Sequence, residues 1–423
     1  MKLKYNIDDK LPLGATVVYA LQWFILAIAV VSTSVFVAQG SPAEKLFYSQ
    51  RLFAVMGVAG LVQVLFGHRM PLVVGPAAVL LVGVLTSLGA GAGTTAIYSS
   101  IAVGGAIVAL LTFGGMMRRV QKLFTPRIVV VILMLIAVTL SQVIKNLIFP
   151  AGVSHAEHIF GLIFTIVGGL GMVVLNRTLS GVAKSLVVPI ALMIGSVAYY
   201  SFFDTAEATN TAASLSGLFI SGFSLDWGLI VAFVICYIAL LINDIGSIES
   251  LGAMLGLESM PQRLKRGVRI TGIMNIVAGS MGVLGPVNYS MSPGVIASTG
   301  CASRWALVPA TVMLALCSLS PDIIWVLTNI PFPVIGVILL FLMGTQLAAS
   351  LEMIHSTQSV RSFADGLTIG LPLMVAMLFQ IMPRGIVPSV IEPLVGNGFA
   401  MGVIVVIIME HIINRSTTVK SGK

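Results

Sequence analysis

Apolar residues occur along this chain in continuous runs, which short polar segments separate. Many runs approach the roughly 20 residues that a helix needs to cross the hydrocarbon core of a bilayer. Strands of a membrane barrel would instead alternate apolar and polar residues. We therefore predict an all-α integral membrane protein with about fourteen transmembrane segments. The predicted segments are 14–37, 52–67, 71–88, 97–115, 127–148, 157–175, 185–203, 227–257, 267–284, 287–300, 304–320, 332–351, 366–383 and 390–412.

The amino-acid composition also indicates an integral membrane protein. Of the 423 residues, 57% are hydrophobic and 9% are charged, whereas a soluble domain carries about 25% charged residues. The longest polar stretches, at 204–226 and 258–269, are too short to fold as separate domains. The three cysteines lie in or beside apolar segments without metal-ligand spacing. We interpret them as small buried side chains and predict neither a metal site nor a cofactor.

Lysine and arginine residues are distributed unevenly among the segments between the predicted spans. With the N-terminus in the cytoplasm, 19 of the 23 fall on the cytoplasmic side, and only Lys45, Arg51, Lys145 and Arg384 fall outside. Cytoplasmic loops of membrane proteins carry this excess. We predict a multi-pass protein of the cell (inner or plasma) membrane with both termini in the cytoplasm. The net charge of +8 is then an orientation signal, and no nucleic-acid partner is expected.

Two sequence features recur at nearly the same offset. The run LFTPRIVVVILMLIAVTL resembles NIPFPVIGVILLFLMGTQL, with Pro126 and Pro333 207 residues apart, and the Gly75-Pro76 pair recurs 210 residues later. This offset divides fourteen spans into two sets of seven, and an odd number gives the two sets opposite orientations. A 7+7 inverted repeat with interrupted helices is typical of transporters whose substrate site lies near the middle of the membrane.

The predicted span 227–257 carries the richest set of polar residues inside an apolar run, where each is costly to bury. Asn243 and Ser247 are four residues apart and share a helix face. Asp244 lies about 100° further round the helix. Two interpretations stay open for Asp244: a packing partner for another helix, or a coupling group that binds a proton or another cation. Glu249 is interpreted as a solvated or paired structural acid.

Segments three and ten are predicted to be short and broken. The helix breakers are Gly75 and Pro76 in 70–83, and Pro293 and Gly294 in 282–300. Backbone groups freed at such breaks are tolerated only against protein or water. The half-helices that follow would direct their N–H-bearing ends at the membrane centre, which favours an anion or the acceptor atoms of a planar solute. Gln22 in the first span adds a buried amide, with an interhelical hydrogen bond as its alternative role.

Several stretches resemble the nucleobase–ascorbate transporter family, which includes uracil and xanthine permeases. DDKLPLGATVVYALQWF is similar to the lead into the family's first span, where Gln22 matches and Trp23 replaces a histidine. FGHRMPLVVGPAA, GCASRW and IPFPVIG also resemble family landmarks. NDIGS aligns Asn243 and Gly246 with a Glu-x-x-Gly motif, whose glutamate binds substrate and is linked to protons in the family.

The resemblance implies a core domain of residues 1–115 and 205–320 and a gate domain of residues 116–204 and 321–423. It also implies that facing short strands in segments three and ten hold the substrate. Asn243 and Met291 stand where such permeases have carboxylates, and asparagine can donate and accept hydrogen bonds but cannot take up a proton as glutamate does. The substrate-binding residues expected from the resemblance and the polar pattern are Gln22, Ala78, Asn243, Ser247, Ser290, Met291 and Ser292.

Together these features favour a secondary active transporter (permease) for a nucleobase-like solute such as uracil or xanthine, coupled to protons or Na⁺ and working by alternating access. The alternative is a transporter of a small anion, a carboxylate or oxyanion, on the same fold, because the site lacks two carboxylates while helix N-termini remain. No enzyme is expected, because no HExxH or Gly-x-Ser-x-Gly arrangement is present. The expected partners are the small solute and the lipid bilayer, and a homodimer is left open.

Overall fold

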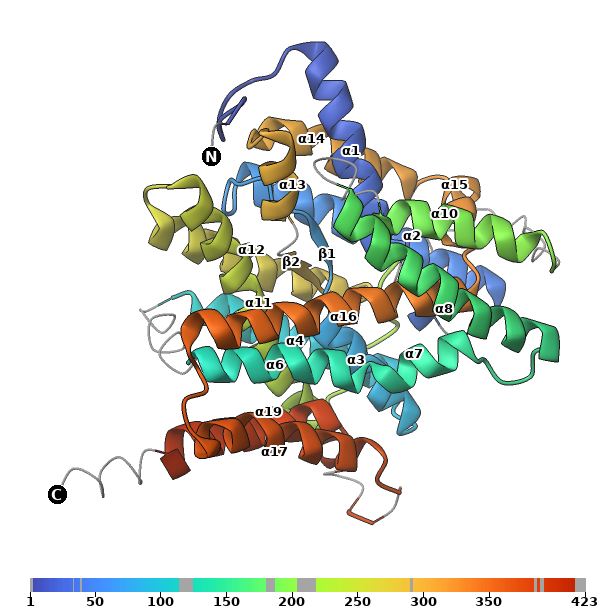
Figure 1. Ribbon diagram of the computed structural model, residues 1–423, viewed down its shortest axis with the longest axis vertical. Helices are drawn as coiled ribbons and strands as arrows, with labels where there is room; N and C mark the ends of the chain where they lie inside the picture. Colours follow the sequence, from blue (N-terminus) through green and yellow to red (C-terminus); the bar gives the residue numbers. More distant parts are fainter. Residues whose placement is uncertain are drawn as a thin grey trace.

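The computed structural model describes residues 3–32, 34–38, 40–113, 125–179, 187–203, 218–289, 292–383, 386–388 and 392–414. Helices dominate these residues and form one large bundle around two short strands (Figure 1). The first part of the chain contains α1 (Leu13–Ser32), η1 (Val35–Val37), α2 (Pro42–Leu65), β1 (Val74–Pro76), α3 (Ala78–Gly89), α4 (Thr94–Leu111), α6 (Pro126–Thr139), α7 (Ser141–Ile148), α8 (His155–Thr178) and α10 (Val187–Tyr200). The second part contains α11 (Trp227–Leu255), α12 (Met260–Ser280), β2 (Pro286–Asn288), α13 (Ser292–Thr299), η2 (Arg304–Ala306), α14 (Leu307–Cys317), α15 (Pro321–Thr328), α16 (Phe332–Thr357), α17 (Phe363–Gln380), α18 (Glu392–Val395), α19 (Gly398–Ile408) and η3 (Met409–Ile413).

Among the described residues, eight helices are long and apolar enough to cross a membrane. The number is up to nine if the helices on either side of a 108° bend after Cys317 form one broken span. Three shorter apolar helices overlap α3, α10 and α19. The prediction of a helical, multi-pass membrane protein is therefore confirmed, while the fourteen-span arrangement stays a prediction. Within the predicted segment 304–320, η2 and α14 form helix from Arg304 to Cys317, and the bend lies at the end of this segment, before Pro321.

Polar residues set the starts of several long helices. A capping box satisfies free backbone N–H groups at the first turns of α2, α8 and α17, each through a serine hydroxyl and a carboxylate three residues later. The polar turn before each of these helices therefore sets the residue at which the helix begins. The three pairs are Ser41–Glu44, Ser154–Glu157 and Ser362–Asp365.

Small residues allow α4 and α12 to pack with their backbones in contact. A Cβ added at Gly272 would lie 2.5 Å from the backbone nitrogen of Ala109, and one at Gly279 would lie 2.5 Å from that of Ala102. Close helix packing through small residues is typical of membrane proteins, where van der Waals contact replaces the hydrophobic effect between helices. α4 and α12, together with α1, α2 and α11, form a first group of helices, of which α1, α2, α11 and α12 contact the two strands.

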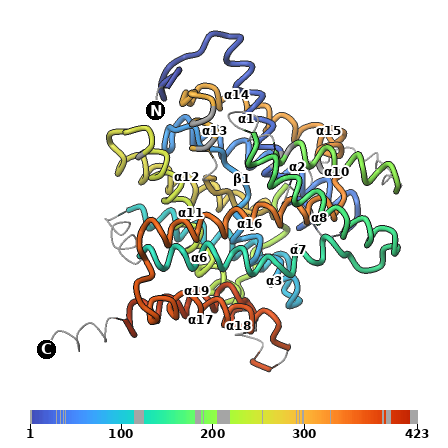
Figure 2. The backbone as a smooth tube through the Cα atoms, in the orientation of Figure 1, coloured from blue at the N-terminus to red at the C-terminus, as the bar shows by residue number. Residues whose placement is uncertain are grey.

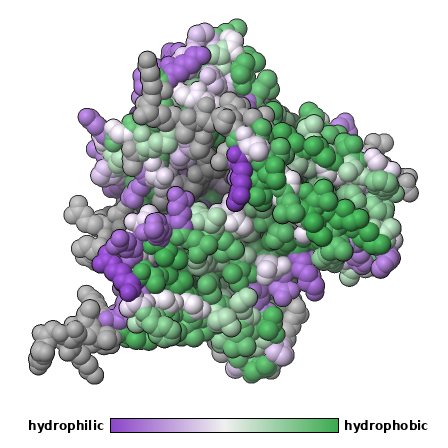
Figure 3. All heavy atoms as spheres, in the orientation of Figure 1, coloured by the Kyte–Doolittle hydropathy of each residue, from purple (hydrophilic) through white to green (hydrophobic). Residues whose placement is uncertain are grey.

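A second group of helices lies beside this first group. α6 and α16 run side by side, and α17 packs on α19 next to them (Figures 1 and 2). Large apolar side chains are exposed along α8 and α17, and Figure 3 shows broad hydrophobic areas over this face with hydrophilic side chains gathered at its edges. Such a surface is suited to lipid, because water would not solvate it. The exposed apolar residues of α8 and α17 include Leu162, Ile166, Val167, Leu170, Leu371, Met374 and Leu378.

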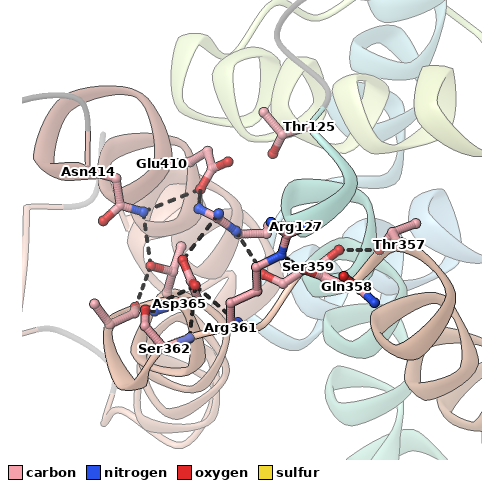
Figure 4. Close-up of polar contacts among 12 residues, drawn as sticks. Thr125, Arg127, Thr357, Gln358, Ser359, Arg361, Ser362, Asp365, Glu410 and Asn414 are labelled. Atoms are coloured by element: carbon pink, nitrogen blue, oxygen red, sulfur yellow. Dashed lines mark hydrogen bonds and ion pairs between the residues drawn. The ribbon is translucent and has the colours of Figure 1, made fainter. Parts of the chain in front are cut away.

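An ionic cluster joins three helices of this second group (Figure 4). Arg127 at the start of α6 contacts Asp365 of α17 and Glu410 of η3, each at 3.1 Å. Its Nε donates to the carbonyl of Ser359 at 2.9 Å. Asn414 donates to Glu410 at 3.4 Å, which adds a second donor for that carboxylate. The guanidinium therefore holds the ends of α6, α17 and η3 together at one end of the bundle.

Candidate functional site

The two strands come from segments that lie more than two hundred residues apart in the sequence and pair antiparallel in the centre of the bundle. Val74 pairs with Asn288, and Pro76 pairs with Pro286. The pairing continues beyond both strands, because Ala77 N–H donates to Gly285 O and Tyr289 N–H donates to Val73 O, both at 2.9 Å. Both strands are fully buried. The breaks in segments three and ten are thus the two strands, which pair with each other.

Each strand is followed by a short helix. α3 begins at Ala78 directly after β1, and α13 begins at Ser292 after β2. Pro293 lies in the first turn of α13, where its missing N–H costs no helical hydrogen bond. Because the strands are antiparallel, the two helices leave the strand pair from opposite ends. The residue before α3, Ala77, supplies no side-chain cap to the first N–H groups of this helix.

Glycine is required at Gly75 by close packing. A Cβ there would lie 2.4 Å from Val30 Cγ1 of α1 and 2.9 Å from the ring of Tyr289. The Tyr289 hydroxyl donates to the carbonyl of Pro76 at 2.6 Å, which fixes the ring across the strand. The absence of a side chain at this position therefore lets α1 approach the strand pair.

A buried network of hydrogen bonds connects β2 to the neighbouring helices. Asp244 of α11 accepts hydrogen bonds from the Asn288 backbone N–H at 3.1 Å, from Asn288 Nδ2 at 2.7 Å and from the Thr271 hydroxyl at 2.8 Å. All three residues are at most 2% exposed. Gln63 of α2 donates to the Thr271 hydroxyl at 2.9 Å. A buried carboxylate needs such donors to remain in the interior, and here they tie α11, α12 and α2 to the strand.

His68 completes this network on the other side of Asn288. Met70 N–H donates to His68 Nδ1 at 3.0 Å, so Nε2 carries the hydrogen and donates to Asn288 Oδ1 at 3.0 Å. Arg263 donates to the carbonyl of His68 at 3.0 Å. The loop before β1 and the strand β2 are thereby connected through side chains, in addition to their backbone pairing.

The structure brings several residues predicted for the substrate site to the strand pair. The Ser247 hydroxyl lies 2.9 Å from the carbonyl of Asn288 and 2.8 Å from that of Asn243. Ser292 accepts a hydrogen bond from Val73 N–H at 3.0 Å, which joins the start of α13 to β1. Asn243 is half-buried on α11, one helix turn before Ser247.

The other predicted site residues lie as follows. Gln22 is buried in α1, which contacts β1. Ala78 is the first residue of α3. Ser290 and Met291 lie outside the described residues. Asp244, the coupling candidate, is fully buried behind β2.

Sequence reasoning missed Asn288, which donates to Asp244, and His68, which donates to Asn288. Both are uncharged polar residues in or beside an apolar segment, where burial is costly unless a partner is present. That cost is a signal that each has a partner, but it does not say which one. Among the described residues, no group of three or more histidine, cysteine or acidic side chains is arranged to hold a metal ion.

A buried strand pair in the middle of a helix bundle, with a short helix after each strand, can bind a solute through backbone donors and acceptors. Comparison with known proteins identifies the family of the chain. The family model described as Permease family (Xan_ur_permease) matches residues 14–385. The chain belongs to this permease family.

Two relatives match this permease over most of their length. The xanthine permease of Bacillus subtilis (strain 168) is 25% identical over 395 residues, which cover 89% of the permease and 88% of that protein. The xanthine permease XanP of Escherichia coli (strain K12) is 23% identical over 451 residues, with coverage of 97% and 94%. The permease is therefore a membrane transporter and not an enzyme.

A solved structure shares the fold of the permease. The transmembrane domain of a cyanobacterium bicarbonate transporter, BicA, superposes with a TM-score of 0.61 over 96% of the permease and 99% of that domain. The sequence identity is 15%, so this likeness concerns the fold alone.

Proposed function

We propose that this permease is a secondary active transporter of a neutral, planar, nucleobase-like solute of the uracil and xanthine class. The proposal rests on one observation above all: xanthine permeases match the chain over nearly their full length. The strand pair in the middle of the bundle supplies a binding surface of the required kind, because a planar ring with carbonyl and N–H groups on its edge can pair with strand backbone and amide side chains.

The proposed contacts follow from the placement of the site residues. The uncapped first turn of α3, at Ala78, would donate backbone N–H groups to a ring carbonyl. The amide of Asn243 would donate and accept at the solute edge. Ser247, Ser292 and Gln22 would support the walls of the site, and Ser290 and Met291 are proposed to lie beside it.

We propose the 7+7 inverted repeat for the architecture, with residues 1–115 and 205–320 as the core and 116–204 and 321–423 as the gate. Antiparallel strands that each lead into a half-helix are what two oppositely oriented repeats would contribute. Transport would proceed by alternating access, through movement of the core against the gate. Both termini would face the cytoplasm, as the lysine and arginine distribution favours.

The alternative cargo is a small anion on the same fold. The bicarbonate transporter with this fold is one reason to test it, but its 15% identity carries no information about cargo. The site region favours a neutral solute, because Asp244 brings a carboxylate to within hydrogen-bonding distance of β2, and a negative charge nearby disfavours an anion.

Uptake into proteoliposomes separates the two cargoes. We expect labelled xanthine or uracil to accumulate and to be displaced by unlabelled nucleobases but not by bicarbonate or small carboxylates. Asn243→Ala should reduce this uptake at least about ten-fold, as the loss of one to two hydrogen bonds in a desolvated site would do. Glu258→Gln, at an exposed position between α11 and α12, is the matched control and should transport normally. Accumulation of a carboxylate or bicarbonate without nucleobase competition would overturn the proposal.

Asp244 is the proposed coupling group. Its three donors stabilise the ionised carboxylate, so a proton would have to bind at the remaining acceptor position of Oδ2. Asp244→Asn keeps one acceptor oxygen and removes the titratable group. We expect this variant to bind solute but to lose acceleration of uptake by an inward proton or Na⁺ gradient. Unchanged gradient-driven uptake would exclude Asp244 from coupling.

A further inference from the structure

A cavity of about 650 Å³ lies between α3 and the helices α6, α7, α16 and α17. We call it the vestibule. One wall is the C-terminal part of α3, which belongs to the proposed core, and the other walls belong to the proposed gate. The vestibule thus lies where the two domains face one another, beyond the end of α3 that is remote from the strand pair. Its lining includes Leu85, Thr86, Gln142, Asn146, Phe379 and Gln380.

The vestibule wall formed by α7 is amphipathic. Ile144, Leu147 and Ile148 are buried, whereas Gln142 and Asn146 are exposed. In a membrane-embedded bundle an exposed polar helix face requires water or a polar partner, because lipid satisfies no hydrogen bond. The polar face of α7 therefore lies against water, which agrees with a hydrated cavity at this end of the bundle.

Amide groups gather in the vestibule. Within the part of the chain that the structure describes, the side chains of Gln142 and Asn146 make no hydrogen bond to other residues. Gln380 Nε2 donates to the carbonyl of Thr139 at 2.6 Å, which orients its amide and leaves the oxygen as an acceptor. Each primary amide has both donors and an acceptor, so these groups match a solute that carries alternating carbonyl and N–H groups.

The rest of the lining suits a neutral ring. Leu85 and Phe379 contribute apolar surface for the ring faces, and no described residue of the lining is charged. Small-molecule sites combine mostly apolar walls with a few placed polar groups, in cavities of about 300–1,000 Å³. The vestibule meets this description, and it offers no positive charge that would select an anion.

We propose that the vestibule is a second, weaker binding site for the same neutral, planar, amide-bearing solute that the central site takes. This inference rests on the proposed function. In the proposed orientation the vestibule opens to the outside, so the solute would bind there before it reaches the strand pair. Gln142 and Asn146 would recognise its edge, and the contact with both domains would make its occupancy sensitive to their relative position.

Equilibrium binding of labelled xanthine to the purified, full-length permease tests this inference. We expect two classes of sites in the wild type. The double variant Gln142→Leu/Asn146→Leu should lose the weaker class, through a rise of more than about ten-fold in its Kd, as removal of two amides predicts. The tighter class should remain, and its retention shows that the variant is folded. Asn243→Leu should have the converse effect.

The matched control is Gln262→Leu, which removes an exposed amide from the first turn of α12, far from the vestibule lining. Both classes should persist in this variant. A single class in the wild type that disappears with Asn243→Leu would refute the vestibule site and leave the proposed function standing. Absence of any xanthine or uracil binding to the wild type would refute both. A weaker class that survives in the double variant would also overturn the inference.

Discussion

Substitution of Asp244 offers the sharpest test of how β2 is held at the centre of the bundle. The carboxylate accepts from the backbone and the side chain of Asn288 and from the Thr271 hydroxyl. Asp244→Ala leaves all three donors without this acceptor in a fully buried environment, whereas Asp244→Asn keeps an oxygen in place for Asn288. The two variants therefore separate the loss of charge from the loss of hydrogen bonding.

The expected magnitudes follow from these contacts. A buried donor left unpaired costs about 1–3 kcal/mol. The Asn288 backbone N–H is fixed by the strand, and the hydrogen bond from His68 to Oδ1 holds the side-chain amide in place. Removing a buried charge returns part of this cost. We expect Asp244→Ala to lower the free energy of unfolding by about 2–4 kcal/mol, and Asp244→Asn by no more than about 1 kcal/mol.

Thermal unfolding of the detergent-purified protein measures this difference. Because membrane proteins often unfold irreversibly, the variants are compared at one scan rate through their apparent Tm. Glu258 is an exposed carboxylate between α11 and α12, and the variant Glu258→Ala should have the same apparent Tm as the wild type. Equal Tm values for Asp244→Ala and Asp244→Asn, both close to the wild type, would refute the argument that these hydrogen bonds hold the strand.

Three further outcomes are expected. Gly75→Ala should destabilise the protein by about 1–3 kcal/mol through overpacking against α1, and a second change, Val30→Ala, should restore part of the Tm; no restoration would contradict the close approach. Arg127→Met should lower the Tm clearly, because two carboxylates lose their cation, and adding Glu410→Gln should recover some of it; a further drop would count against the charge argument. Asp8→Ala removes an ion pair to an exposed carboxylate and should change the free energy of unfolding by less than about 1 kcal/mol. It should nevertheless accelerate the hydrogen exchange of residues 300–304, because these residues pair with the N-terminal segment. Unchanged exchange would show that the ion pair does not hold that segment.

The apolar runs were enough to predict the class of this protein. A lipid-facing backbone must satisfy its own hydrogen bonds, so a long apolar run has almost no alternative to a helix. The breaks near Gly75 and before α13 were also readable, because proline and glycine interrupt a helix by local geometry. The prediction of a broken segment at each of these positions required no knowledge of the partner segment.

The resemblance to permeases depended on short motifs, and the comparison with the family model then established membership for residues 14–385. Motifs such as NDIGS pointed to this part of α11, where the Ser247 hydroxyl lies 2.9 Å from the carbonyl of Asn288 in β2. They could not show that Asp244, one position after Asn243, turns away to bind Asn288 behind the strand. Neighbouring helix positions point about 100° apart, and only the packing of α11 decides which of them faces the strand.

Hydropathy and helix breaking are properties of a few adjacent residues, so the order of the amino acids was enough to predict a helical membrane protein with broken segments. The tertiary structure alone decided which segments meet. Val74 pairs with Asn288, Asp244 is buried, and Gln142 and Gln380 line one cavity. Each of these features depends on contacts between residues that lie far apart in the chain. Such contacts depend on how helices pack as whole bodies, and no local pattern records that packing.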